Sequence, residues 1–257
     1  MLQNLDVFEA DAVIIDLEDS VHHLEKDAAR DLVQSFLDKF SKINGKIYIR
    51  LNQVDSPHFE TDINLLNPLS FDGYVIPKAN ACNLKQVASH TRKSLIPIIE
   101  TPRDVLNALD IADSKNVIGI ILGAEDLTKE IGVNRTKEGN EILFARSKIV
   151  FAASAAGIEA IDTPYVGKDD LKELRDDAIF AKSIGFTGKA IIHPNHVDLI
   201  NQVFKPTDQE IKQANRIIKA ANKHKKGAFS LDGKMIDLPV IERAKKLLEV
   251  AEKYSKK

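Results

Sequence analysis

The chain has 257 residues, of which 44% are hydrophobic and 29% are charged. This length can bury a sizeable core in one α/β domain of barrel size and requires no second globular domain. The 36 Lys and Arg residues nearly balance the 38 Asp and Glu residues, which argues against nucleic acid or a membrane surface as a partner.

Cysteine content and hydropathy limit the cellular setting. The one cysteine, Cys82, excludes an internal disulfide and suits a reducing compartment, and the sequence indicates no role for it. The longest apolar run, residues 117–122, is far shorter than the roughly 20 residues that span a bilayer. We therefore expect a cytoplasmic protein without a membrane helix or a signal peptide.

Seven short apolar runs recur along the chain, each followed by a stretch of helical character. Their centres are almost continuously apolar, as in Val13-Ile14-Ile15, which is typical of strands covered on both faces. Strands that alternate with helices in this way form a parallel sheet. The predicted strands cover residues 10–17, 46–51, 73–78, 95–100, 117–123, 157–163 and 185–193.

The intervening segments have the periodicity of helices that cover a sheet. A helix over residues 27–40 is expected to bury the face that carries Ala28, Leu32, Phe36 and Leu37. Beyond the barrel region, residues 1–204, we predict a C-terminal helix and lid extension, residues 205–257. This extension begins with a helix capped by Thr207, with Asp208 and Glu210 in its first turn.

A (β/α)₈ TIM barrel needs eight strands, and only seven are predicted before this extension. An open doubly wound sheet is the alternative. Residues 1–4 read as the start of a helix directly before the first predicted strand. We therefore favour a barrel that lacks its first strand and carries a C-terminal helical lid.

Polar and charged residues stand at the C-terminal ends of all seven predicted strands. In an α/β barrel the active site is assembled from these ends, so most members of the set are expected to be functional. The set comprises Asp16, Glu18 and Asp19, then Arg50 and Asn52, Lys78, Glu100, Glu125 and Asp126, Asp162, and His193.

Glu100 and Asp126 are the best candidates for metal ligands. They follow neighbouring strands, and hard oxygen ligands from separate strand ends, completed by water and substrate, are how Mg²⁺ is usually held. The alternative is that these acids pair with Arg50 or Lys78 or cap the next helix. Zinc-type spacings and glycine-rich phosphate loops are absent from the sequence, so zinc and nucleotide chemistry have little support.

Two further residues are candidates for substrate chemistry. The Arg50 guanidinium is suited to hold an oxyanion through two fixed hydrogen bonds, although a structural ion pair with Asp16 or Glu18 is the alternative. His193 precedes Pro194 and is either a proton carrier or a residue hydrogen-bonded into the barrel rim.

Short motifs in a fixed order extend over nearly the whole chain. They are residues 10–21 (ADAVIIDLEDSV), 25–27 (EKD), 49–52 (IRLN), 76–78 (IPK), 99–102 (IETP), 122–127 (LGAEDL), 162–165 (DTPY), 192–194 (IHP) and 233–237 (GKMID). Together they resemble the citrate lyase β subunit family within the HpcH/HpaI aldolase superfamily. Arg135-Thr136, Glu138-Gly139 and residues 141–147 are most similar to the citrate lyase β subunits, which favours a citryl thioester as the substrate.

This resemblance implies a magnesium-dependent TIM barrel with specific residue roles. Glu100 and Asp126 would bind Mg²⁺, Arg50 would contact substrate, with Glu100 also lining the substrate site, and Asp237 on the C-terminal lid would serve acid–base catalysis. Members of the family usually begin with a strand reading R-S-x-L-F-V-P-G, which this chain does not have. In related enzymes that segment supplies the first barrel strand and contacts to the carrier's phosphates.

The expected reaction is cleavage of a citryl thioester to oxaloacetate and an acetyl thioester. The acyl group would be carried by the phosphopantetheine of CoA or of an acyl carrier protein, with other citrate lyase subunits as possible partners. A homo-oligomer, trimer-like, is expected. The alternatives are a stand-alone malyl- or citramalyl-CoA lyase, a malate synthase-like enzyme, and a non-catalytic barrel subunit of an assembly.

Overall fold

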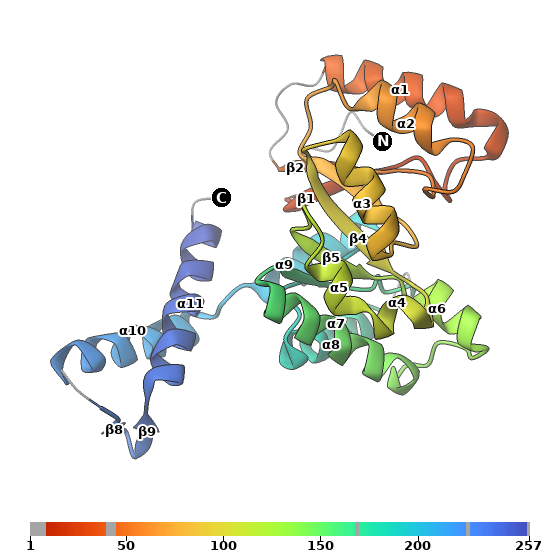
Figure 1. The fold of residues 1–257 in the computed structure, drawn as a ribbon. Helices are drawn as coiled ribbons and strands as arrows, with labels where there is room; N and C mark the ends of the chain where they lie inside the picture. Colours follow the sequence, from red (N-terminus) through yellow and green to blue (C-terminus); the bar gives the residue numbers. More distant parts are fainter. Residues whose placement is uncertain (1–8, 40–44, 168–169, 225–226, 256–257) are drawn as a thin grey trace. The chain divides into compact units, whose positions relative to one another are not determined.

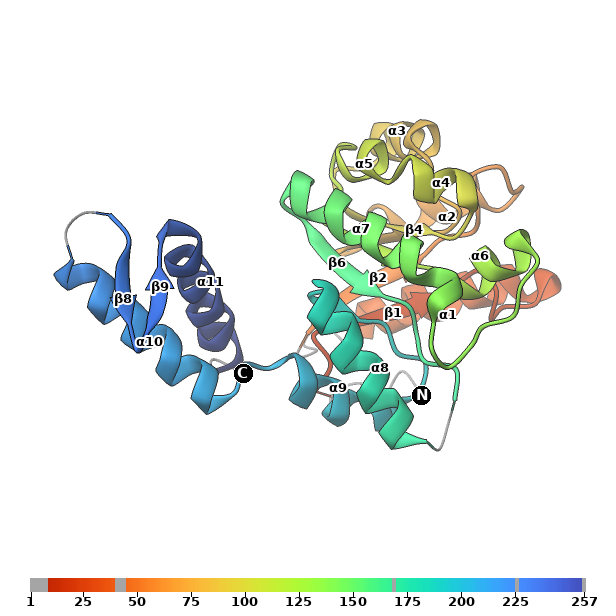
Figure 2. The same cartoon turned by 90° about the horizontal axis from the view of Figure 1, so that it is seen from below.

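A computed structural model describes residues 9–39, 45–167, 170–224 and 227–255 (Figures 1 and 2). The chain divides into two compact units, Met1–Ile200 and Asn201–Lys257. No described helix is long and apolar enough to cross a membrane.

The first unit is built on a parallel sheet whose strands lie in sequence order from β1 to β7. Each strand pairs with the next in parallel, so the sheet curls as half of a barrel with β1 and β7 at its described edges. All seven predicted strands are confirmed; β4 has the predicted length with its bounds shifted by one residue, and the other six are shorter than the apolar runs. They are β1 (Ala12–Asp16), β2 (Lys46–Arg50), β3 (Gly73–Ile76), β4 (Ser94–Ile99), β5 (Gly119–Leu122), β6 (Glu159–Asp162) and β7 (Gly188–Lys189).

Helices follow the strands and pack on the outside of the sheet (Figure 1). Two of the long helices are α1 (Lys26–Lys39), which contacts α2 (Phe59–Leu66), and α7 (Leu143–Ala156), which packs on β5 and β6. The other elements are α3 (Ala81–His90), α4 (Pro102–Leu106), α5 (Ala108–Ala112), α6 (Ala124–Ile131), α8 (Leu171–Ile184), α9 (Val197–Phe204), and the 3₁₀ turns η2 (His23–Glu25), η3 (Asn140–Ile142) and η4 (Pro194–His196).

Both faces of the sheet are buried at its centre. Tyr48, Val75 and Ile96 belong to an apolar cluster on one face, whereas Ile49 and Tyr74 alternate with them along β2 and β3 and are fully buried as well. This arrangement explains the continuous apolar runs in the sequence. The apolar centres of the strands therefore hold the sheet together and leave its carboxyl edge free to carry polar groups.

The buried face of α1 differs from the prediction. Leu32 is 61% exposed, and Ala28 is exposed too, whereas Lys26, Arg30 and Val33 are buried with Phe36. The prediction was wrong because it assumed that charged side chains face solvent. The Arg30 guanidinium is instead buried against the Asp62 carboxylate of α2, with 2.6 Å between Nε and Oδ1.

The second unit consists of α10 (Asp208–Lys223), the antiparallel strands β8 (Phe229–Leu231) and β9 (Lys234–Ile236), and α11 (Leu238–Ser255). The predicted start of α10 is confirmed, because Thr207 and Glu210 form a reciprocal capping box. The hairpin was not predicted. Its turn places Asp232 and Gly233 in the left-handed region, and Arg216 of α10 pairs with Asp232.

Asp162, at the end of β6, lies in a fully buried ion network. Its carboxylate accepts two hydrogen bonds of 2.9 Å from Arg146 and one of 2.6 Å from Lys189. Asp177 of α8 contacts the same two cations at 2.6 Å each. Two cations therefore face two carboxylates, and Lys189 also donates to the carbonyl of Thr163. The balanced charges indicate that this network stabilises the packing of α7 and α8 against β6 and β7.

We expect Asp162→Asn to lower the free energy of unfolding by about 3–5 kcal/mol, because two buried cations would then share one carboxylate. Asp232→Asn, which removes the exposed partner of Arg216, should cost less than about 1 kcal/mol. Urea denaturation of both variants measures the difference. Equal losses would show that the Asp162 network is not held together by its charges.

Candidate active site

The first part of the site is an ion pair across the ends of β1 and β2. Asp16 and Arg50 are direct neighbours in the sheet register. The guanidinium donates from Nε to Asp16 Oδ1 at 2.7 Å and from Nη2 to Oδ2 at 2.6 Å. Its third nitrogen, Nη1, lies 3.2 Å from Glu18 Oε2. The alternative considered for Arg50, an ion pair with Asp16 or Glu18, is therefore present, while its side chain stays 21% exposed.

These contacts shift the acidity of both carboxyl groups. Burial alone would raise the pKa of Asp16, but the hydrogen bonds and charge of Arg50 outweigh it and lower the pKa to about 2. Burial raises the pKa of Glu18, which accepts a 3.1 Å hydrogen bond from Gln53. Asp16 is thus firmly bound to Arg50, whereas Glu18 is a poorly solvated carboxyl group facing the interior of the site.

The second part of the site is Glu100, directly after β4. The side chain is buried, and its Oε1 accepts a 2.6 Å hydrogen bond from the backbone N–H of Lys78, at the end of β3. Lys78 has a φ of 43°, in the left-handed region that a lysine rarely adopts. Such strain costs on the order of 1 kcal/mol and is common where the backbone is held for function. Here it aims an N–H group at the carboxylate.

Gly123, directly after β5, makes room for the Glu100 carboxylate. A Cβ added to Gly123 would lie 2.6 Å from Glu100 Cβ, 2.7 Å from Glu100 Oε2 and 2.8 Å from Ile98 Cγ2. Gly123 has a φ of −95°, which any residue can adopt, so the requirement for glycine is one of space. The position keeps Oε2 clear, and no described residue donates a hydrogen bond to it.

Asp126 completes an acidic group, in the first turn of α6 after β5. Burial, then the charges of Glu18 and Asp126, raise the pKa of Glu100 to about 7, although the Lys78 N–H and Arg50 act against this shift. Glu18, Glu100 and Asp126 each follow a strand of the same sheet at its carboxyl edge. Arg50 contacts Asp16, Glu18 and Asp19, so the carboxylates of this group outnumber the cation that pairs with them.

These residues fit a hard divalent cation. Glu100 Oε2 and the Asp126 carboxylate offer oxygen ligands that no described hydrogen bond occupies. Within the described part of the chain, no three His, Cys, Asp or Glu side chains converge on one point. Two protein carboxylates, with water and substrate in the other positions, are typical of Mg²⁺ rather than of an all-protein metal cage.

Three further candidates from the sequence have other described partners. Asp162 belongs to the buried ion network, so its expected functional role at the strand end is replaced by a structural one. His193 accepts a 3.3 Å hydrogen bond at Nδ1 from the backbone of Asn195, in a cap of η4. Asp237 belongs to the second unit, where its Oδ1 accepts from the N–H of Val240 at the start of α11.

Two contributors were missed from the sequence, namely the Lys78 backbone and Gly123. A backbone N–H gives no signal in residue type, and a left-handed lysine cannot be predicted. Gly123 carried a usable signal, because a glycine at the end of a buried strand often marks a close approach of another group.

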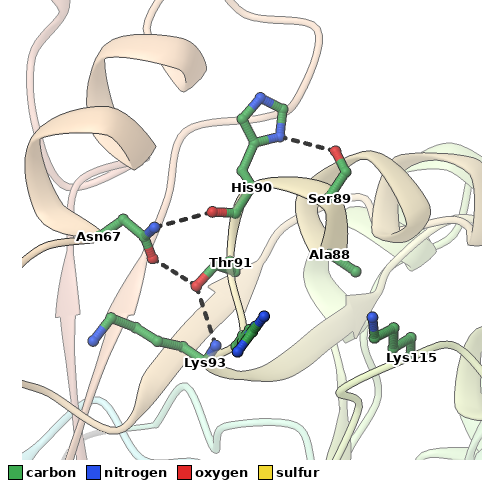
Figure 3. A pocket seen from close by; sticks show the side chains of 8 residues that line it. Asn67, Ala88, Ser89, His90, Thr91, Lys93 and Lys115 are labelled. Carbon is green, nitrogen blue, oxygen red and sulfur yellow. Dashed lines mark hydrogen bonds between the residues drawn. The ribbon is translucent and has the colours of Figure 1, made fainter.

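An open hollow lies at the opposite, amino edge of the sheet and is separate from this group (Figure 3). Its volume is about 780 Å³, and Asn67, Thr91 and Lys93 are among its lining residues. These side chains mostly bond within the wall, as in the 2.6 Å contact from Thr91 Oγ1 to Asn67 Oδ1. In α/β barrels this edge serves stability, and we assign the hollow no catalytic role.

The curled parallel sheet with carboxylates at its carboxyl edge defines a barrel-type enzyme with a cation site. The family model described as HpcH/HpaI aldolase/citrate lyase matches residues 1–194. The chain therefore belongs to the HpcH/HpaI aldolase/citrate lyase family, and the resemblance seen in the sequence motifs is confirmed.

Known proteins similar to this chain include two lyases and one solved complex. The chain is 36% identical to citrate lyase subunit beta of Haemophilus influenzae, covering 98% of this chain and 92% of that protein. It is 29% identical to mitochondrial citramalyl-CoA lyase of Rattus norvegicus, covering 100% and 83%. The structure of CitE from Mycobacterium tuberculosis with magnesium, acetoacetate and coenzyme A has a TM-score of 0.81 at 28% identity, covering 95% and 90%.

We expect Gly123→Ala to raise the half-saturating Mg²⁺ concentration by about tenfold or more, because the new methyl group displaces Glu100. The matched control is Gly188→Ala, where an added Cβ meets nothing within 4 Å. Magnesium titration of both purified variants is the measurement. A normal Mg²⁺ response in Gly123→Ala would show that the position of Glu100 does not matter for the metal.

Proposed function

We propose that this protein is a Mg²⁺-dependent carbon–carbon lyase that cleaves a citryl thioester into oxaloacetate and an acetyl thioester. The observation that carries the proposal is the pair Glu100 and Asp126, which follow the neighbouring strands β4 and β5 at the carboxyl edge, with Oε2 of Glu100 free of any described hydrogen bond. The family membership and the similarity to citrate lyase subunit beta support the substrate class. The reaction takes place in the cytoplasm.

Glu100 and Asp126 would hold Mg²⁺, as the complex of the Mycobacterium tuberculosis protein contains magnesium. When bound, the metal polarises the substrate hydroxyl oxygen that becomes the ketone of oxaloacetate. The buried Lys78 N–H contact holds Glu100 in a single orientation. This leaves the Oε2 side of the carboxylate toward the substrate space.

Arg50 binds the substrate oxyanion in this proposal. A base removes the hydroxyl proton, the carbon–carbon bond breaks, and the electron pair moves onto the thioester as an enolate, which then takes up a proton. Asp16 accepts hydrogen bonds from two of the guanidinium nitrogens and so fixes the plane of Arg50, while Nη1 lies 3.2 Å from Glu18 Oε2 and the side chain remains 21% exposed. A cation held in advance stabilises the developing negative charge without reorganising.

Asp237 is the proposed acid–base residue, with His193 as the second candidate. It lies in a unit whose long helices bury little of their own surface, since Ala214 is the buried residue of α10 and Ala244 that of α11. Two helices with so little buried surface gain stability when they cover another surface. We therefore propose that residues 205–257 act as a lid over the site of a neighbouring copy in a homo-oligomer, trimer-like.

The acyl carrier is a phosphopantetheine arm, of CoA or of an acyl carrier protein in a larger citrate lyase assembly. The solved complex that contains coenzyme A supports an arm of this kind. The similarity to citramalyl-CoA lyase keeps a stand-alone citramalyl- or malyl-CoA lyase as the second candidate.

We expect Glu100→Ala and Asp126→Ala each to lower kcat/KM at least about a thousandfold, because the metal supplies several kcal/mol of charge stabilisation. The control is Glu125→Ala, next to Asp126 but 61% exposed, which should stay active. Steady-state cleavage of citryl-CoA and malyl-CoA, with and without chelator, measures this effect and the substrate preference. Full activity in chelator would remove the metal role, and faster malyl-CoA cleavage would favour the second candidate.

Asp237→Ala should reduce kcat by at least about a hundredfold and leave the Mg²⁺ requirement unchanged, since the residue moves protons and does not bind metal. Asp232→Ala, in the turn of the same unit, is the control and should keep its rate. Turnover at varied Mg²⁺ concentrations separates the two effects. A parallel change in Mg²⁺ affinity would assign Asp237 to the metal instead.

A further inference from the structure

Lys26 is a buried lysine beneath the acidic loop that follows β1. It is the first residue of α1 and is 8% exposed. Its ammonium donates one hydrogen bond to the carbonyl of Leu17 and one to the carbonyl of Glu18, each 2.7 Å long. No carboxylate in the described part of the chain forms an ion pair with it, so backbone carbonyls are its described partners.

The position of the Lys26 ammonium is unfavourable for two reasons. A positive charge at the first residue of a helix opposes the helix dipole, which typically costs about 0.3–1 kcal/mol. Burial of an ammonium without a counter-charge adds a desolvation cost. Local choices that oppose the general rules are expected mainly at functional or strained sites.

The two carbonyls that Lys26 binds determine where the Glu18 side chain points. The carbonyl of Glu18 also accepts from the N–H of Val21, and the N–H of Glu18 donates to Asp16 Oδ1 at 2.8 Å. The backbone of Glu18 is therefore held on both sides. Its carboxylate then contacts Arg50 and Gln53, at the same carboxyl edge of the sheet that carries Glu100.

We propose that Lys26 is a positioning residue that holds the Glu18 carboxylate against Arg50, at the edge that carries Glu100, and thereby raises the affinity of the site for a divalent cation. The inference rests on the proposed metal role of Glu100 and Asp126. Removing the positive charge of Lys26 would by itself strengthen cation binding, because a nearby repulsion is lost. The proposal predicts the opposite change in Mg²⁺ affinity. Binding should become weaker, because Glu18 loses its fixed position.

The test is isothermal titration of the full-length protein with Mg²⁺ alone. Lys26→Met, which keeps the length of the side chain and removes the ammonium, should raise the dissociation constant for Mg²⁺ about tenfold, the usual size of effect for a residue behind a metal ligand. An unchanged constant, or tighter binding, would overturn the proposal.

The chain offers a closely matched control at the opposite edge of the sheet. The Lys93 ammonium also donates to two backbone carbonyls, of Leu69 at 2.7 Å and of Phe71 at 3.3 Å, and it lies in the wall of the hollow in Figure 3. Lys93→Met also removes an ammonium that donates to two backbone carbonyls, but at the end of β4 opposite to Glu100. It should lower stability yet leave the dissociation constant within about twofold of the parent.

A double-mutant cycle with Glu18→Gln tests the route of the effect and remains informative if Lys26→Met folds poorly. Glu18→Gln alone should weaken Mg²⁺ binding by a similar factor, and adding Lys26→Met should then weaken it less than about twofold further. Unchanged binding in Glu18→Gln, or fully multiplicative effects, would overturn the proposal. Glu100→Ala distinguishes failure of the proposed metal site from failure of the proposed role of Lys26. Unchanged Mg²⁺ binding in Glu100→Ala would disprove the metal site, and with it this inference.

Discussion

The buried carboxylate of Glu100 is the constraint to which the surrounding structure is adapted. Parallel pairing of β3, β4 and β5 brings their carboxyl ends to one edge, so the Lys78 N–H, Glu100 and Gly123 become neighbours. The strained backbone of Lys78 supplies a hydrogen bond, and the missing side chain of Gly123 supplies space. Each feature alone would be a local defect. Together they hold one acid in a fixed orientation.

Charge balance separates the functional acids of this fold from the structural ones. At the edge that carries Glu100, Arg50 pairs with Asp16, Glu18 and Asp19, so the carboxylates outnumber the cation that pairs with them. Around Asp162 and Asp177, two cations face two carboxylates and every charge is matched. A matched network needs no ligand to be stable, whereas an unmatched one is suited to bind a cation.

The regularity of the fold follows from simple patterns, and its irregular parts do not. The strands could be predicted because both faces of the sheet are buried, which produces continuous apolar runs. The buried face of α1 could not be predicted, because the partners of Lys26 and Arg30 are backbone carbonyls or a carboxylate far away in the sequence. The short β8–β9 hairpin has too few residues to produce a recognisable alternation.

The sequence by itself determined the alternation of strands and helices, the family, and the residue types at the strand ends, because these depend on local composition and order. It placed Glu100 and Asp126 after neighbouring strands and identified them as the metal candidates, but it did not show that Asp162, at the end of another strand, is structural. Only the tertiary structure decided that Asp162 is neutralised by Arg146 and Lys189, while Oε2 of Glu100 stays free. The physical reason is that the state of a buried charge depends on which groups surround it, and those groups are brought together by strand pairing and helix packing rather than by adjacency in the chain.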